Sequence, residues 1–194
     1  MIKLGNFTVV IDSCVLYDSL LRDILLRLAE KELYQPIWSS VICEEVKRNL
    51  SKRIPDEKVE KLIKMMNDAF PEAIVDDYSI LPNIDEPRIN EKDRHVLAAA
   101  ISSNAQVIVT NNLRDFPNEV LSEYNIEAQS PDVFLVNLFY LSFDKVYNSF
   151  IEMNKSLSNP PIERDDLIRM FEARVPTFIE NLKPHLASNV IRIY

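Results

Sequence analysis

The chain has 194 residues, of which 47% are hydrophobic and 27% charged, a composition typical of a globular protein long enough to bury a core. Its single glycine disfavours the P-loop and the Rossmann dinucleotide-binding turn, because both need several glycines close together. The formal net charge of −8 disfavours a large basic surface for nucleic acid. It leaves room for a compact nuclease site, where metal ions supply positive charge beside carboxylates.

The sequence also indicates a compartment. No apolar run approaches the roughly 18 residues that cross a bilayer, and no signal-peptide pattern opens the chain. The two cysteines, Cys14 and Cys43, lack the spacing of metal ligands and are typical of reduced thiols. We therefore expect a cytoplasmic protein with no membrane partner.

The first part of the chain alternates predicted strands with predicted helices. Runs of β-branched and other apolar residues predict strands at residues 7–11, 34–38, 73–75 and 106–110. Helical spacing predicts helices from Val15, from a cap at Ser39 or Ser40, from Pro55, and from a cap at Asn90. This alternation implies a parallel sheet covered by helices on both faces.

The pattern becomes purely helical after about Ser130. Predicted helices cover residues 131–141, 143–157, 163–174 and 176–186. The predicted organisation is therefore an α/β domain at residues 1–129, followed by an all-helical domain at residues 130–194.

Acidic side chains follow two of the predicted strands. Asp12 comes directly after the first strand, and Asp115 closes the loop after the strand at 106–110. Ligands of open parallel sheets bind beyond the carboxyl ends of the strands, so both acids are candidate site residues. Thr110 and Asn112 lie in the second loop and can offer oxygens or hydrogen bonds. The alternative for Asp115 is a cap for a helix beginning at Phe116.

Two further acids lie near predicted helix starts. Glu45 lies on the inward arc of its helix, at roughly 100° per residue, whereas Glu44 points away; the arc consists of Val41, Ile42, Val46 and Leu50. Asp93 lies three residues after the cap at Asn90 and shares a face with Val96 and Leu97. The alternatives are an ion pair for Glu45 and a favourable helix-dipole interaction for Asp93.

Taken together, the four acids indicate one shared site. In a doubly wound sheet, strand ends and helix starts lie on one rim, which places Asp12, Glu45, Asp93 and Asp115 near one another. Converging carboxylates repel each other unless protons or hard cations such as Mg²⁺ or Mn²⁺ neutralise them. Such clusters suit the hydrolysis of phosphodiester bonds.

The acidic segments resemble those of a known family. The segments VVIDSCVLY, ICEEVKRNL, KDRHVLAAAI and VIVTNNLRDFP are similar to the four acidic segments of the PIN domain, in family order, over about residues 5–130. The pattern is most similar to the VapC-like toxins of toxin–antitoxin pairs. The tail, from SPDVFLVNL to LSNPPIERDDLIRMFEARVPTFIENL, resembles the helical C-terminal domain of one VapC subgroup.

The resemblance implies a fold and a reaction. It implies a three-layer α/β/α sandwich around a parallel sheet and an endoribonuclease that uses Mg²⁺ or Mn²⁺ and leaves a 5′-phosphate and a 3′-hydroxyl. It implies that Asp12, Glu45 and Asp93 hold the principal cation and that Thr110 orients its loop or Asp12. Many PIN domains have Asp where this chain has Asn112, so Asp115 becomes the fourth carboxylate and a one-metal site stays open beside a two-metal site.

The resemblance also implies partners. These are an RNA substrate and an antitoxin protein with a segment that occludes the cleft. Four cations between residues 46 and 55 are either a solvated helix end or contacts to the RNA backbone; they are Lys47, Arg48, Lys52 and Arg53. Within the tail, the stripe Phe143, Val146, Tyr147, Phe150 and Ile151 packs the helices together, and part of it could serve an antitoxin or homodimer interface.

Three other classes of protein fit the sequence less well than a PIN nuclease. A receiver-like domain needs an acidic pair near the first strand and a Lys after the last, and neither is present. A haloacid-dehalogenase-type phosphatase needs a second Asp where Cys14 stands. A non-catalytic PIN module that binds RNA or protein is disfavoured by the complete acids, although Asn112 leaves it open. Cys14 is interpreted as packing the strand–helix turn, His95 as structural or solvated, and Trp38 as core.

Overall fold

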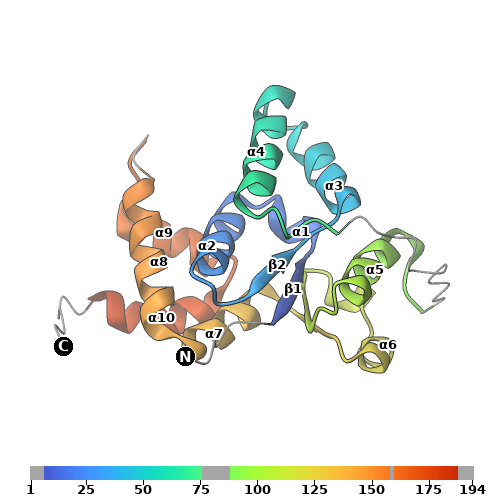
Figure 1. Cartoon of the computed structure of the whole chain (residues 1–194). Helices are drawn as coiled ribbons and strands as arrows, with labels where there is room; N and C mark the ends of the chain where they lie inside the picture. The colour runs from blue at the N-terminus through green and yellow to red at the C-terminus, as the bar shows by residue number, and fades with distance from the viewer. Residues whose placement is uncertain (1–6, 76–87, 158–159, 188–194) are drawn as a thin grey trace. The chain divides into compact units, whose positions relative to one another are not determined.

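The computed structural model describes residues 7–75, 88–157 and 160–187, which lie in two compact units, Met1–Ser130 and Pro131–Tyr194 (Figure 1). The predictions that fall on residues 1–6, 76–87, 158–159 and 188–194 lie outside the described residues.

The first unit is built on a parallel sheet of four strands in the order β2-β1-β3-β4. The strands are β1 (Thr8–Ile11), β2 (Gln35–Ile37), β3 (Val107–Val109) and β4 (Glu127–Gln129). Strand β1 pairs with β2 on one side and with β3 on the other, so the strand order reverses at β1. The predicted parallel sheet is confirmed.

Two strand predictions differ from the structure. Strand β4 was not predicted, because its sequence EAQ contains no β-branched or aromatic residue. It forms because its backbone pairs with β3, with hydrogen bonds of 2.9 and 3.0 Å at its two ends. The strand predicted at 73–75 is reduced to one parallel bridge between Trp38 and Ile74.

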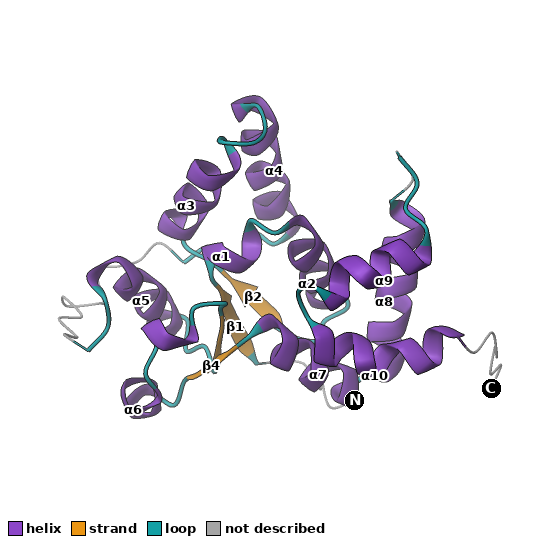
Figure 2. Cartoon of the chain, turned by 180° about the vertical axis from the view of Figure 1, so that it is seen from behind, coloured by secondary structure: helices purple, strands orange, loops and turns teal. Residues whose placement is uncertain are grey.

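Helices cover the sheet on two sides. They are α1 (Ser13–Leu16), α2 (Ser19–Glu30), α3 (Ser40–Leu50), α4 (Asp56–Ala69), α5 (Arg94–Ser102) and α6 (Asn118–Leu121), with short 3₁₀ turns η2 (Glu91–Asp93), η3 (Leu113–Asp115) and η4 (Ser122–Tyr124). Helix α2 contacts β2, and α5 contacts β1 and β3. Figures 1 and 2 show α2 and α5 on opposite sides of the strands. The predicted α/β/α sandwich is confirmed.

Local sequence accounts for the ends of several helices. Ser39 caps α3, since its hydroxyl accepts a hydrogen bond from the Ile42 amide at 3.2 Å. The helix predicted from Val15 is divided in two, because Asp18 accepts from two amides and caps a new helix, α2. In a chain with one glycine, Asn takes over the left-handed position after α5, where Asn104 has φ 50°.

The second unit consists of helices. They are α7 (Pro131–Leu141), α8 (Phe143–Ser156), α9 (Arg164–Glu172) and α10 (Pro176–Ala187), and they confirm the predicted helical extension. Buried aromatic side chains of the four helices form its core: Phe134, Phe150, Phe171 and Phe178. Asp132 fixes the start of α10, because its carboxylate accepts from the amides of Thr177 at 3.2 Å and Phe178 at 2.8 Å.

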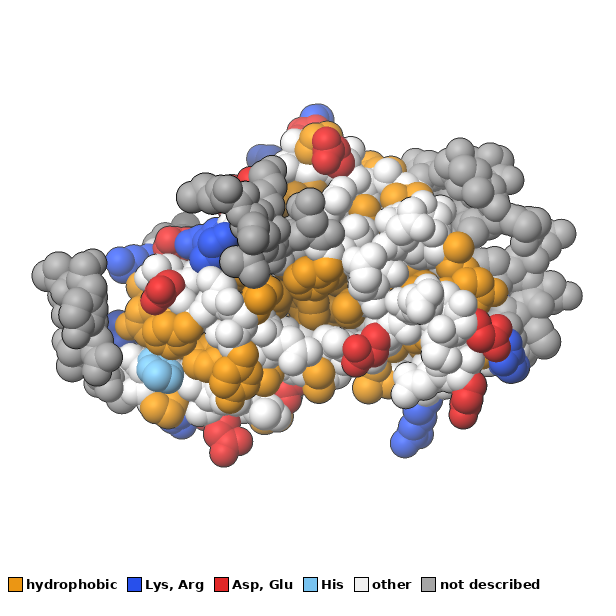
Figure 3. Space-filling view, turned by 60° about the horizontal axis from the view of Figure 1, so that its bottom comes forward, with side chains coloured by type: hydrophobic (Ala, Val, Ile, Leu, Met, Phe, Trp, Pro, Cys, Tyr) orange, Lys and Arg blue, Asp and Glu red, His pale blue; other side chains and the backbone are white. Residues whose placement is uncertain are grey.

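The predicted stripe on α8 is only partly buried. Val146 and Phe150 are fully buried, whereas Phe143 is 37% exposed. Other apolar side chains of this unit are also exposed, including Tyr140 at 71%, and Figure 3 shows hydrophobic side chains on the molecular surface. No helix among the described residues has both the length and the apolar character needed to cross a bilayer.

Candidate active site

Asp12 lies at the carboxyl end of β1, the strand at which the sheet order reverses. Its amide donates to the Val109 carbonyl at 3.0 Å, which extends the pairing of β1 with β3 by one residue. The Asp12 residue is only 6% exposed. Asp12 therefore lies where the sequence predicted it, directly after the first strand, and this is the position where open parallel sheets bind their ligands.

Two side chains donate hydrogen bonds to the Asp12 carboxylate, and a third lies close to it. Thr110 Oγ1 donates to Asp12 Oδ2 at 2.7 Å, and Cys14 Sγ donates to the same oxygen at 3.1 Å. Ser13 Oγ lies 3.3 Å from Asp12 Oδ1. The amide of Asn112 in turn donates to Thr110 Oγ1 at 3.0 Å. Thr110 therefore orients both Asp12 and its own loop.

Cys14 has more contacts than packing at a turn would require. Its sulfur lies 3.4 Å from Thr110 Oγ1 and accepts a hydrogen bond from the Asn111 amide at 3.2 Å. Burial, followed by the negative charge of Asp12, raises the pKa of Cys14 to about 12. The thiol therefore stays protonated at neutral pH and is a hydrogen-bond donor instead of a nucleophile.

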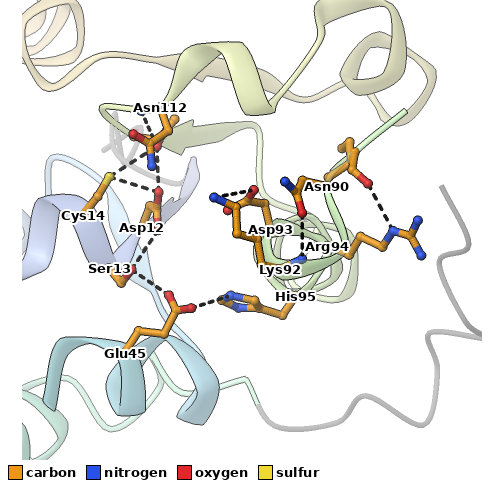
Figure 4. A network of polar contacts seen from close by, with 12 residues as sticks. Asp12, Ser13, Cys14, Glu45, Asn90, Lys92, Asp93, Arg94, His95 and Asn112 are labelled. Atoms are coloured by element: carbon orange, nitrogen blue, oxygen red, sulfur yellow. Dashed lines mark hydrogen bonds and ion pairs between the residues drawn. The ribbon is translucent and has the colours of Figure 1, made fainter. Parts of the chain in front are cut away.

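Glu45 reaches the same site from α3. Its Oε2 accepts a hydrogen bond from Ser13 Oγ at 2.7 Å, and its Oε1 lies 3.4 Å from His95 Nε2 (Figure 4). The Glu45 side chain is 25% exposed, against 63% for Glu44, so the predicted difference between the two is observed. The predicted arc was wrong at Val41, which is 38% exposed.

The inward face of α3 is rotated relative to the prediction. Cys43 is buried on this helix in place of Val41, because α3 packs against α1, α4 and α5 at the same time. Sequence periodicity describes one apolar arc and cannot show contacts with three neighbours.

Asp93 and His95 face the site together, which helical spacing alone did not predict. Asp93 ends the 3₁₀ turn η2, and α5 begins only at Arg94. Asp93 is therefore not part of the regular face of α5, and His95 lies beside Glu45, with its Nε2 atom 3.4 Å from Glu45 Oε1. The nearest signal in the sequence was the spacing of two residues between Asp93 and His95.

The Asp93 carboxylate is poorly compensated by its surroundings. Its side chain is 16% exposed, and its Oδ2 atom is buried and accepts no hydrogen bond from the described residues. The nearest ion-pair partner of this oxygen, Lys92 Nζ, lies 3.9 Å away. Burial raises the pKa of Asp93; the charge of Lys92 opposes the rise, and the charges of Asp115 and Asp12 add to it.

Asp115 is close enough to Asp93 to affect its protonation. It ends the turn η3 and does not cap the next helix, α6, which begins at Asn118 after Pro117. The alternative interpretation as a helix cap was therefore wrong. Asp12, Glu45 and Asp93 lie near one another (Figure 4), and Asp115 is near enough to act on Asp93 through its charge. The exposed Asn112 lies in the same loop as Asp115.

The donor atoms fit a hard divalent cation. Asp93 Oδ2 accepts no hydrogen bond from the described residues, and the Ser13 hydroxyl lies 3.3 Å from Asp12 Oδ1, so both carboxylate oxygens have lone pairs to offer. Carboxylate oxygens are the ligands that Mg²⁺ and Mn²⁺ prefer. Within the described ranges, no three His, Cys, Asp or Glu side chains have the spacing of a formed metal site.

The four cations that follow Glu45 differ in their surroundings. Lys47 Nζ lies 2.8 Å from Glu44 and 3.3 Å from Glu60, so it links α3 to α4. The hydrogen bond with Glu44 is the main cause that raises the pKa of Lys47. The remaining three are exposed; they are Arg48, Lys52 and Arg53.

The fold and the four acids Asp12, Glu45, Asp93 and Asp115, called the acidic rim below, define a class of protein. Comparison with known families gives the same class. Residues 8–114, more than half of the chain, match the PIN domain, and residues 131–184 match the VapC50 C-terminal domain. The chain belongs to the PIN domain family. The resemblance to PIN proteins with a VapC-type helical C-terminal domain is thereby confirmed.

A relative supports the same placement. A Mycobacterium tuberculosis (strain ATCC 25618 / H37Rv) protein named "Putative ribonuclease VapC50" is 39% identical over 87 residues, which are 45% of this chain. The aligned segment spans 52% of that relative, about half of its length. No solved structure matches the chain.

Proposed function

We propose that this protein is a metal-dependent endoribonuclease that hydrolyses RNA phosphodiester bonds and acts as the toxin of a toxin–antitoxin pair. The observation that carries the proposal is the convergence of Asp12, Glu45, Asp93 and Asp115 at the switch point of a PIN-family sheet. The name of the relative, a ribonuclease, is consistent with this activity. We assign the nuclease to residues 1–129 and a separate helical domain to residues 130–194.

Each acid has a proposed role. Asp12, Glu45 and Asp93 hold the principal cation, Mg²⁺ or Mn²⁺, and Asp115 supplies the fourth carboxylate. When bound, the cation supplies charge neutralisation at the scissile phosphate and activation of the attacking water. Thr110 keeps Asp12 in one orientation through its 2.7 Å hydrogen bond. Asn112, in the same loop as Asp115, carries no charge to hold a second cation, and a site with one cation would still support hydrolysis.

The proposed partners follow from this activity. They are an RNA substrate and an antitoxin protein with a segment that covers the acidic rim, and the cytoplasm is the compartment where RNA and such a partner are both available. The antitoxin would hide the same carboxylates that the RNA must reach.

Metal removal tests the proposal. The full-length protein, purified without a partner, is incubated with structured RNAs and Mg²⁺ or Mn²⁺. We expect cleavage that stops when EDTA is added and returns with excess Mn²⁺. Cleavage that continues in EDTA would contradict the metal site. No cleavage of any RNA, together with tight binding of a protein partner, would favour a non-catalytic PIN module.

The exposed cations give a second test. In EDTA, Arg48→Ala/Arg53→Ala should weaken RNA binding, and each lost phosphate contact should flatten the slope of log affinity against log salt by about 0.7 for single strands. Filter binding or fluorescence anisotropy at several salt concentrations measures this slope. Lys64→Ala is the matched control, because Lys64 is exposed on α4 and paired with Asp68. An unchanged slope would mean that the run is only a solvated helix end.

A further inference from the structure

The Glu45 carboxylate is held at both of its oxygens by side chains from other elements. Ser13, at the start of α1, donates to Oε2 at 2.7 Å, and His95 of α5 lies 3.4 Å from Oε1 (Figure 4). Glu45 itself projects from α3. A side chain from α3 is therefore fixed against α1 and α5, although Glu has enough rotatable bonds to adopt several positions.

Ser13 lies between two carboxylates. Its hydroxyl is 2.7 Å from Glu45 Oε2 and 3.3 Å from Asp12 Oδ1, and Ser13 is only 8% exposed. A hydroxyl has one proton to donate, so the shorter contact to Glu45 takes it. The hydrogen bond stabilises Glu45 next to Asp12, a like charge that would otherwise repel it. It also leaves Asp12 Oδ1 with its lone pairs available.

The contacts of His95 indicate which of its two ring nitrogens carries the proton. Its Nδ1 atom is buried and has no hydrogen-bond partner among the described residues. A proton on Nδ1 would leave a buried N–H group unsatisfied, which is costly. The contacts therefore assign the proton of a neutral imidazole to Nε2, which faces Glu45 Oε1.

We propose that Ser13 and His95 are positioning residues that fix Glu45 beside Asp12 and so preorganise the cation site. Neither residue touches the substrate in this role; both act through Glu45. The inference rests on the proposed function and deepens it. Hydrogen-bond partners of ligating side chains typically contribute about 10- to 100-fold to metal affinity, so both residues should have measurable effects.

Mn²⁺ binding is the first readout, measured by isothermal titration calorimetry on the full-length protein without RNA. Ser13→Ala should raise the Mn²⁺ dissociation constant by about tenfold or more. In the Glu45→Ala background, the same substitution should change it by less than about twofold, because a residue that acts through Glu45 has no effect once Glu45 is removed. Ser13→Thr keeps the hydroxyl and should stay near the wild-type value.

His95 is tested in the same way. His95→Leu should weaken Mn²⁺ binding, and His95→Gln, which keeps an N–H donor on the side chain, should restore part of the affinity. Ser149→Ala is the matched control for Ser13, because Ser149 is fully buried and its hydroxyl has no partner among the described residues. His185→Gln, in the helical unit, is the control for His95. Both controls should bind Mn²⁺ like the wild type.

Thermal unfolding in EDTA is the second readout and needs no metal. Ser13→Ala should lower the melting temperature by about 2 °C in the wild-type background and by less in the Glu45→Ala background. Additive effects of Ser13 and Glu45 on melting, or wild-type Mn²⁺ affinity in Ser13→Ala and His95→Leu, would overturn the positioning role while leaving the proposed nuclease intact. A wild-type protein that binds no Mn²⁺ would instead overturn the proposed function, and this inference with it.

Discussion

Asp12→Asn should reduce metal-dependent RNA cleavage by about a thousandfold or more, to the level measured in EDTA. The proposed cation contributes several kcal/mol of charge stabilisation, and each factor of ten in rate corresponds to about 1.4 kcal/mol. The substitution removes a full negative charge at the centre of the acidic rim. The other acids cannot replace it, because they lie on other elements with their own contacts.

The substitution should leave the fold intact. An Asn side chain can place its oxygen where Thr110 and Cys14 now donate to Asp12 Oδ2. Its amide group then faces the Ser13 hydroxyl, whose oxygen can accept a hydrogen bond. The local hydrogen bonds are therefore preserved in number, and only the charge is lost.

Single-turnover cleavage of a labelled RNA, with RNA affinity measured separately in EDTA, distinguishes catalysis from binding. RNA affinity should stay within about twofold or rise, since one repulsive charge is removed. Asp68→Asn is the matched control, because Asp68 is an exposed acid that pairs with Lys64 on α4. An Asp12→Asn protein that cleaves at a rate within tenfold of the wild type would contradict a role for Asp12 in metal binding.

Asp93→Asn should stabilise the metal-free protein and at the same time remove its stabilisation by Mn²⁺. Asp93 Oδ2 is buried and accepts no hydrogen bond within the part of the chain that the structure describes, and the charges of Asp115 and Asp12 act against its ionisation. An amide carries no charge to repel, so the melting temperature in EDTA should rise by about 2 °C. Mn²⁺ raises the melting temperature of the wild type by mass action, and this rise should largely disappear in the variant.

The pH dependence of this difference follows from the raised pKa of Asp93. A carboxyl whose pKa is higher in the folded protein than in the unfolded chain binds more protons when folded, so it costs stability as the pH rises through that range. The advantage of Asp93→Asn should therefore be fully present at neutral pH and shrink as the pH falls toward 3.8, the ordinary value. Differential scanning fluorimetry in EDTA across this range provides the measurement. A variant less stable than the wild type at pH 7 would show that Asp93 has a structural partner.

Much of the fold follows from local patterns. The apolar run at 7–11 forms β1, and each predicted helix of the tail forms within a few residues of its predicted bounds. Such patterns are local, because a strand or helix needs only its own spacing of apolar residues and its caps. Pairing between distant strands is not local. β4 forms without strand propensity, whereas residues 73–75, which have it, form a single bridge.

The candidate site likewise has residues that the sequence could predict and contacts that it could not. Asp12 could be recognised because it follows a strand, and the family segments pointed to Glu45, Asp93 and Asp115. The contacts of Ser13 and His95 with Glu45 could not be recognised in this way, because Glu45 lies far from both of them along the chain.

The sequence by itself determined the alternation of strands and helices, the helical tail, and the order of the acids along the chain. Only the tertiary structure decided which atoms meet: Ser13 and Glu45 are 32 residues apart, and Asp12 and Thr110 are 98 apart. Hydrogen bonds over such distances exist only after parallel strands have brought their carboxyl ends to one edge. The same folding step brings the acids together, and it leaves an oxygen of Asp93 without a hydrogen-bond partner among the described residues. The charge repulsion that favours a cation therefore arises from the fold.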